Sequence, residues 1–329
     1  MVREHQMRPL PAFAVYIGRH VLIGHKDPSG SLTDIVWRGL GPYGVPILAR
    51  RDGFIIFNFP AVEKYAGGIV PEDEFSAGGV PDPARKAEEV RADIAYRRFD
   101  YMNGFMLPVA LQEPVHPYNY FQAIQGEAGW ELLSRGKYEH QKRQRLSQLE
   151  TAILDHSIEA MNKCQAALGE DSIVLLSLLY AAGHHNRLHQ FASAQVIAWS
   201  VVEMLVNRLW GDLLGEVAIS ETHGTGHTQM SKDRRKVLGG PDYSASVVSQ
   251  ILSITNKIDD PLLERLDRAR KTRNDFAHGI KKKRGNATRE LIRVTPADAG
   301  TTLRLATDLL SRITRAEVHP NLSIAYWGI

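Results

Sequence analysis

Cysteine is almost absent from this chain, since Cys164 is the only one among 329 residues. A single thiol excludes an intrachain disulfide framework and is typical of a reducing compartment, so we expect a cytoplasmic protein. Cys164 stands in a stretch with helical patterning, where we expect a buried structural thiol and not a nucleophile.

Long apolar runs are also missing. The longest, residues 173–182, is far shorter than the roughly 20 residues that a membrane-spanning helix needs. Near the N-terminus Arg3 and Arg8 are present, but Pro9 and Pro11 interrupt any apolar segment of a signal peptide. We therefore expect no membrane partner and no secretion.

Recognisable cofactor and metal sites are scarce. Gly39-Leu-Gly41-Pro-Tyr-Gly44 matches the dinucleotide pattern GxGxxG, but prolines and a strand-like run follow where a helix should begin, so we interpret it as a turn. His185 and His189 have the i,i+4 spacing of two metal ligands on a helix. No acidic or cysteine partner stands nearby, and a polar helix start is the alternative. We expect neither a cofactor nor a metal.

Charge is distributed unevenly along the chain. The net charge is only +3, yet residues 231–290 hold 15 Lys and Arg against 8 Asp and Glu. The rest of the chain is therefore slightly acidic. A local positive excess of this size favours a polyanion such as RNA as partner, although a solvated charged face gives the same pattern.

The pattern of apolar residues predicts an α+β protein with two domains. Residues 1–80 contain β-branched and aromatic runs separated by turns, and a helix is expected over 83–103. We place the boundary near residue 130, with an α+β domain over 1–130 and a helical domain over 131–329. The expected later helices cover 130–168 (with a break near Gly136), 173–183, 191–214, 244–258 and a segment from Asp259 onward, with short strands or turns in 286–304 before a last helix to about 318.

Polar side chains are concentrated in the segment from Arg270 to Gly279, at the expected end of a helix. The helix is expected to begin at Asp259-Asp260-Pro261, because acidic residues cap free amides and proline suits the first turn. Apolar residues then recur at helical spacing, and Arg273 falls on the same face. Glu203, within the apolar 191–214 helix, is the candidate partner of Arg273, with an exposed glutamate as the alternative.

The residues at this helix end can carry out phosphodiester chemistry. A neutral His278 can take a proton from a ribose 2′-hydroxyl, Arg273 can stabilise the charge of a phosphorane, and Asn274 can orient them. Four basic residues that follow would hold flanking phosphates: Lys281, Lys282, Lys283 and Arg284. One histidine cannot be base and acid at once, which favours two copies facing each other. Stabilisation of the helix dipole by Arg and His is the structural alternative.

The segment Arg273-Asn-Asp-Phe-Ala-His278 resembles the signature of the HEPN superfamily, an Arg followed by a polar residue and a His five positions on. The resemblance covers residues 140–318. It implies a helical bundle that dimerises, and a metal-independent endoribonuclease acting through 2′-hydroxyl attack in defence or toxin systems. A non-catalytic HEPN-like module that binds RNA or protein is the alternative. Residues 1–130 would then sense a trigger or bind a regulatory protein.

Overall fold

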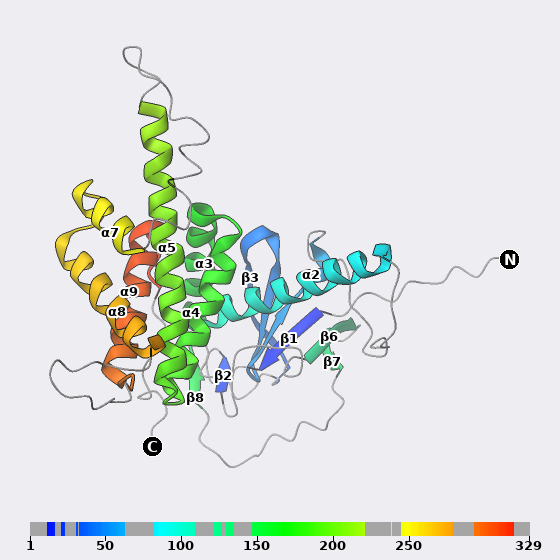
Figure 1. Cartoon of the computed structure of the whole chain (residues 1–329). Helices are drawn as coiled ribbons and strands as arrows, with labels where there is room; N and C mark the ends of the chain where they lie inside the picture. Colours follow the sequence, from blue (N-terminus) through cyan, green and yellow to red (C-terminus); the bar gives the residue numbers. More distant parts are fainter. Residues whose placement is uncertain are drawn as a thin grey trace. The chain divides into compact units, whose positions relative to one another are not determined.

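The computed structural model shows an α+β chain, with an antiparallel sheet in the N-terminal part followed by helices, as the sequence predicts (Figure 1). The structure describes residues 12–16, 21–23, 31, 33–62, 82–108, 121–126, 129–133, 147–220, 238, 245–278 and 293–318. Contacts divide the chain into two compact units, Met1–Tyr180 with Thr314–Ile329, and Ala181–Ile313.

A six-stranded antiparallel sheet organises the first unit. Its strands run in the order β3 (Ile35–Leu40), β4 (Pro46–Arg50), β5 (Phe54–Phe57), β1 (Ala12–Tyr16), β6 (Phe121–Gly126) and β7 (Gly129–Leu133). Two short strands, β2 (Val21–Ile23) and β8 (Ser147–Leu149), pair in parallel beside it. All four residues of β5 are buried, as expected of a strand in the middle of a sheet with both faces covered.

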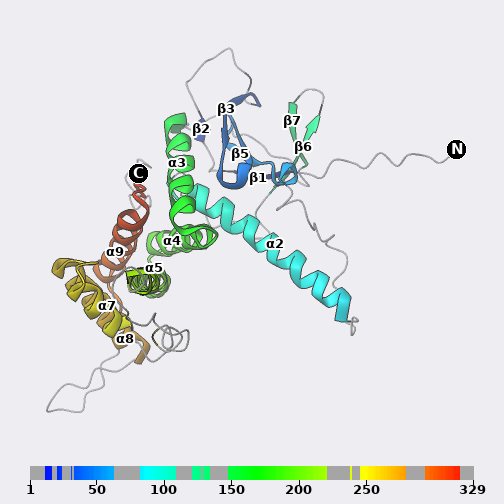
Figure 2. The same ribbon diagram turned by 90° about the horizontal axis from the view of Figure 1, so that it is seen from above.

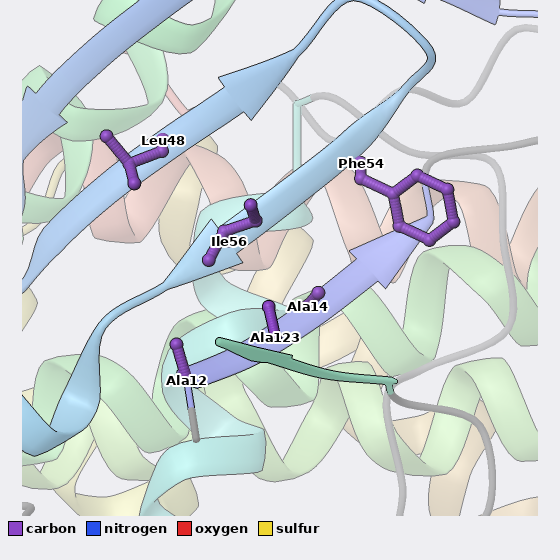
Figure 3. Packing of buried hydrophobic residues seen from close by; sticks show 6 residues of the cluster. All are labelled: Ala12, Ala14, Leu48, Phe54, Ile56 and Ala123. Atoms are coloured by element: carbon purple, nitrogen blue, oxygen red, sulfur yellow. The ribbon is translucent and has the colours of Figure 1, made fainter. Parts of the chain in front are cut away.

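Alternation along the strands gives the sheet one tightly packed apolar face. Leu48 and Ala14 flank Ile56 on the neighbouring strands, and Ala12 is opposite Ala123. Together with Phe54 these side chains form one buried cluster (Figure 3). Because side chains two apart on a strand point the same way, this register also buries the remaining residues of β5 on the other face.

Helices α2 (Asp82–Met106) and α3 (Thr151–Leu168) pack with this part of the chain. Trp37 donates from Nε1 to Asp155 Oδ1 at 2.8 Å, which ties β3 to α3. The glycine-rich segment is a turn between β3 and β4, with the 3-10 turn η1 (Pro42–Gly44), as predicted. A Cβ at Gly41 would meet the Tyr101 hydroxyl, which donates to Pro42 O at 3.1 Å. The glycine therefore permits close packing.

Helices make up the second unit. They are the end of α4 (Asp171–Arg187), α5 (Phe191–Ser220), α7 (Ala245–Ile254), α8 (Asp260–His278) and α9 (Pro296–Thr314, except its last residue). Figure 2 looks down α5, with α7, α8 and α9 gathered beside it. An apolar stripe of α5, the helix expected over 191–214, is buried at Ala194, Ala198, Val201 and Leu205. The described helices of this unit therefore gather around α5, a long apolar helix.

Three predicted features of the chain differ from the structure. Residue 130 is not a boundary, because β7 pairs with β6 across it and α3 packs on β3, so the first unit continues to Tyr180. The helix expected over 130–168 begins only at Thr151, after β7 and β8. Residues 300–304, expected as a turn before a second strand or the last helix, lie within that last helix, α9, where packing buries Ala299, Leu303 and Ala306 at helical spacing.

Candidate functional site

The motif helix α8 begins and ends where its sequence predicts. Asp259 caps it, because its Oδ1 accepts the backbone N–H of Leu262 at 3.0 Å. That bond, followed by the Arg312 guanidinium at 2.9 Å, lowers the pKa of Asp259 below its ordinary value. The helix ends at His278. The motif therefore occupies the last turn and a half of a helix that is well defined at its start.

Packing fixes α8 within the second unit. Leu262, Leu266 and Ala269 are almost fully buried, as the helical spacing predicts, while Phe276 is half-buried. An ion pair between Arg265 and Asp308, 2.6 Å apart, links α8 to α9. Because both side chains of that pair remain partly exposed, we assign it less than about 1 kcal/mol. Burial of the apolar face is therefore the main source of docking free energy.

Arg273 and Asn274 form a bonded pair near the end of α8. Arg273 Nη1 donates to Asn274 Oδ1 at 3.1 Å, and both side chains are half-buried. Among the described residues, no carboxylate lies within ion-pair distance of the Arg273 guanidinium. Within the described part of the chain, the remaining N–H groups of Arg273 are therefore open to an anion.

The helix geometry relates this pair to the position of His278. Arg273 and His278 are five residues apart, which turns their Cα atoms by about 140° around α8. Asn274 and His278 are four residues apart and share a face of the helix. The bond from Arg273 to Asn274 thus directs the guanidinium toward the face on which His278 stands. The His278 side chain, and Lys281, Lys282, Lys283 and Arg284, lie outside the described part of the chain.

Glu203 is not brought to Arg273. Helices α5 and α8 run antiparallel, because Gln195 bonds Ala269 while Glu216 pairs with Lys257. Glu203 lies eight residues, or about 12 Å, beyond Gln195 along α5, and Arg273 lies four residues, or about 6 Å, beyond Ala269 along α8. Because the helices are antiparallel, these two displacements from the Gln195–Ala269 contact point in opposite directions and add. The axial separation of about 18 Å exceeds the reach of both side chains. Half-buried Glu203 is therefore not the ion-pair partner that the sequence led us to expect.

The histidines that resemble metal ligands are not on one helix. His185 lies in the last turn of α4, whereas His189 follows the helix in the left-handed conformation with φ of 59°. The polar helix start that the sequence suggests at His185 and His189 is therefore the end of α4. His185 Nδ1 contacts Gln190 Oε1 at 2.5 Å. In the ranges that the structure describes, no group of three or more His, Cys, Asp or Glu side chains is placed to hold a metal ion.

Sequence reasoning missed one polar residue beside the motif helix. Gln195 has no exposed surface, and its Nε2 donates to Ala269 O at 3.4 Å. The signal in the sequence is a lone amide on an apolar helix face, next to Ala194 and one turn before Ala198. Helical periodicity alone places Gln195 on the buried side of α5.

Comparison with known proteins adds no family to this picture: no family model, no curated protein and no solved structure matches the chain. Across the described ranges, none of the helices combines the length and apolar character that crossing a membrane requires. The motif residues and the geometry of α8 are therefore the features that point to a function.

Proposed function

We propose that this chain is a metal-independent endoribonuclease of HEPN type, active as a homodimer in the cytoplasm and serving defence or a toxin system. The bond between Arg273 and Asn274 at the exit of α8 is the observation that carries the proposal. It turns the guanidinium, whose other donors have no partner among the described residues, toward the helix face of His278. Such a guanidinium can grip two non-bridging oxygens of a phosphodiester.

The residues of the motif divide the reaction between them. The His278 imidazole takes the proton of a ribose 2′-hydroxyl, and the 2′-oxygen attacks the adjacent phosphorus. Arg273 stabilises the added negative charge of the phosphorane, with Asn274 holding the guanidinium in place. The 5′-oxygen then leaves with a proton from the His278 of a second copy. The products are a 2′,3′-cyclic phosphate and a 5′-hydroxyl.

A second copy is required by this division of labour, because one imidazole cannot accept and donate a proton in the same step. The basic run Lys281–Arg284 of each copy would hold phosphates on either side of the cleaved bond. In the sequence this run begins three residues after His278, and we propose that its positive charge serves the same site. The first unit would sense a trigger or bind a regulatory protein.

The proposal is tested by incubating cellular RNA with the protein in EDTA and identifying the fragment ends. We expect cyclic phosphate ends with the wild type, and a loss of rate of at least about 100-fold in His278→Ala. Arg273→Lys keeps the charge but loses the planar fork, and we expect a loss of roughly 100-fold. His189→Asn is the matched control, since that exposed histidine lies outside the motif and Asn tolerates its left-handed backbone.

Other outcomes lead to different conclusions. Equal cleavage by the wild type and His278→Ala would contradict the assignment of His278. Without cleavage by either protein, the assay is repeated with extract of phage-infected cells to supply an activating signal. RNA binding that persists in His278→Ala without any cleavage in either condition supports the non-catalytic HEPN-like module instead.

A further inference from the structure

A fully buried glutamine of α5, Gln195, lies where α5 contacts the motif helix α8. Gln195 has an exposed fraction of 0%, and its neighbours Ala194 and Ala198 are equally buried and apolar. The amide donates to the backbone carbonyl oxygen of Ala269 at 3.4 Å. A polar group buried in an apolar interface with one long bond contributes little net stability, since it gave up its bonds to water. Its presence at this position therefore calls for another explanation.

The carbonyl that Gln195 contacts is the one that anchors Arg273. In an α-helix the C=O of residue i accepts the N–H of residue i+4. Because α8 is continuous from Asp260 to His278, Ala269 O receives the backbone N–H of Arg273. Gln195 thus bonds the same oxygen as the backbone of the proposed catalytic arginine. A displacement of this peptide group moves Arg273 directly.

The bonding around Gln195 leaves its second polar atom unused. Ala269 O can only accept, so it selects the NH2 end of the amide and directs Oε1 away. In the described part of the chain, that buried oxygen has no donor, and the buried Nε of Arg270 likewise has no acceptor. An interface selected for stability alone would satisfy these atoms or replace them with apolar ones. Retaining them is understandable if the position of α8 matters for function.

We propose that Gln195 is a positioning residue for the site on α8. It fixes where the Ala269 carbonyl lies relative to α5, and so sets the axial and rotational position of the Arg273–Asn274 pair. Its catalytic consequence rests on the proposed ribonuclease function, whereas its effect on the backbone of Arg273 does not. Misplacement of a catalytic group by about 1 Å can cost on the order of 100-fold in rate.

The test replaces Gln195 with Met, which keeps the length and approximate volume of the side chain but cannot donate to Ala269 O. We expect an unchanged or higher melting temperature, because the orphaned oxygen disappears. Amide hydrogen exchange at residues 270–276, with Arg273 resolved, should become faster. In the RNA assay, kcat should fall by about 10-fold or more with little change in KM.

Ser249→Ala is the matched control. Ser249 is also a buried polar residue of the second unit, but its Oγ donates to Ala245 O at 2.7 Å within its own helix α7. We expect neither exchange at Arg273 nor kcat to change in this variant. A buried polar group that acts only within its own helix thus provides the baseline.

Unchanged exchange at Arg273 in Gln195→Met overturns the proposal, whatever the activity, and so does wild-type kcat in that variant. If the wild type cleaves no RNA, the proposed function fails, and hydrogen exchange alone decides the positioning role. If Gln195→Met does not fold, Gln195→Asn takes its place. It keeps the amide but is one methylene too short to reach Ala269 O, and the same two results are expected.

Discussion

Docking of α8 should depend chiefly on Leu266, and Leu266→Ala measures that dependence. Leu266 is 2% exposed on the buried face that also includes Leu262 and Ala269. Truncation of a leucine at such a site removes its transfer free energy and leaves a cavity, so we expect a loss of about 3 kcal/mol. For a cooperative unit of roughly 130 residues, this corresponds to a fall in melting temperature of about 10 °C.

The assay is thermal unfolding followed by circular dichroism at 222 nm and by calorimetry. Leu188→Ala is the matched control, because Leu188 belongs to the same unit but is 53% exposed. It should change the melting temperature by no more than about 1–2 °C. Similar losses of stability in both variants, or a loss of less than about 1 kcal/mol in Leu266→Ala, would contradict this expectation. Either result would mean that α8 is not held by this apolar face.

Three further results are expected elsewhere in the chain. Because the Leu262 N–H lowers the pKa of Asp259, the Asp259 carboxylate stabilises the fold above the unfolded pKa of 3.8, and this stabilisation is lost as the pH falls below that value. The melting temperature of Asp259→Asn should therefore decline less than that of the wild type between about pH 5 and pH 2. Burial raises the pKa of Cys164 to about 11 from 9.0, so native alkylation at pH 8, followed by mass spectrometry, should be about 100-fold or more slower than after denaturation. Gly41→Ala should cost about 2 kcal/mol in urea unfolding because its Cβ collides with the Tyr101 hydroxyl, and less in a Tyr101→Phe background.

Local signals predicted the motif helix well. The cap at Asp259, the proline after it and the spacing of Leu262, Leu266 and Ala269 are all properties of neighbouring residues. They determine the start, the buried face and the position of Arg273 near the end without knowledge of the rest of the fold. The α+β class followed in the same way from the strand-like runs of the N-terminal part.

Features that depend on distant residues could not be predicted in this way. Residues 129–133 contain a short apolar run that fits a helix or a strand, and only pairing with β6 decides for β7. The orientation of α5 against α8 separates Glu203 from Arg273 and selects Gln195 as the neighbour of Ala269. Both outcomes are set by the packing of helices that lie far apart in the sequence.

The central claim is attack by the ribose 2′-hydroxyl, and the most direct measurement compares two oligonucleotides of one sequence. One is RNA and the other is fully 2′-O-methylated, and both are incubated with the wild-type protein in EDTA under the conditions that support cleavage of cellular RNA. We predict cleavage of the RNA, with a 2′,3′-cyclic phosphate end, and none of the methylated strand. Cleavage of the methylated strand would contradict the role of the 2′-hydroxyl and the assignment of His278 as its base.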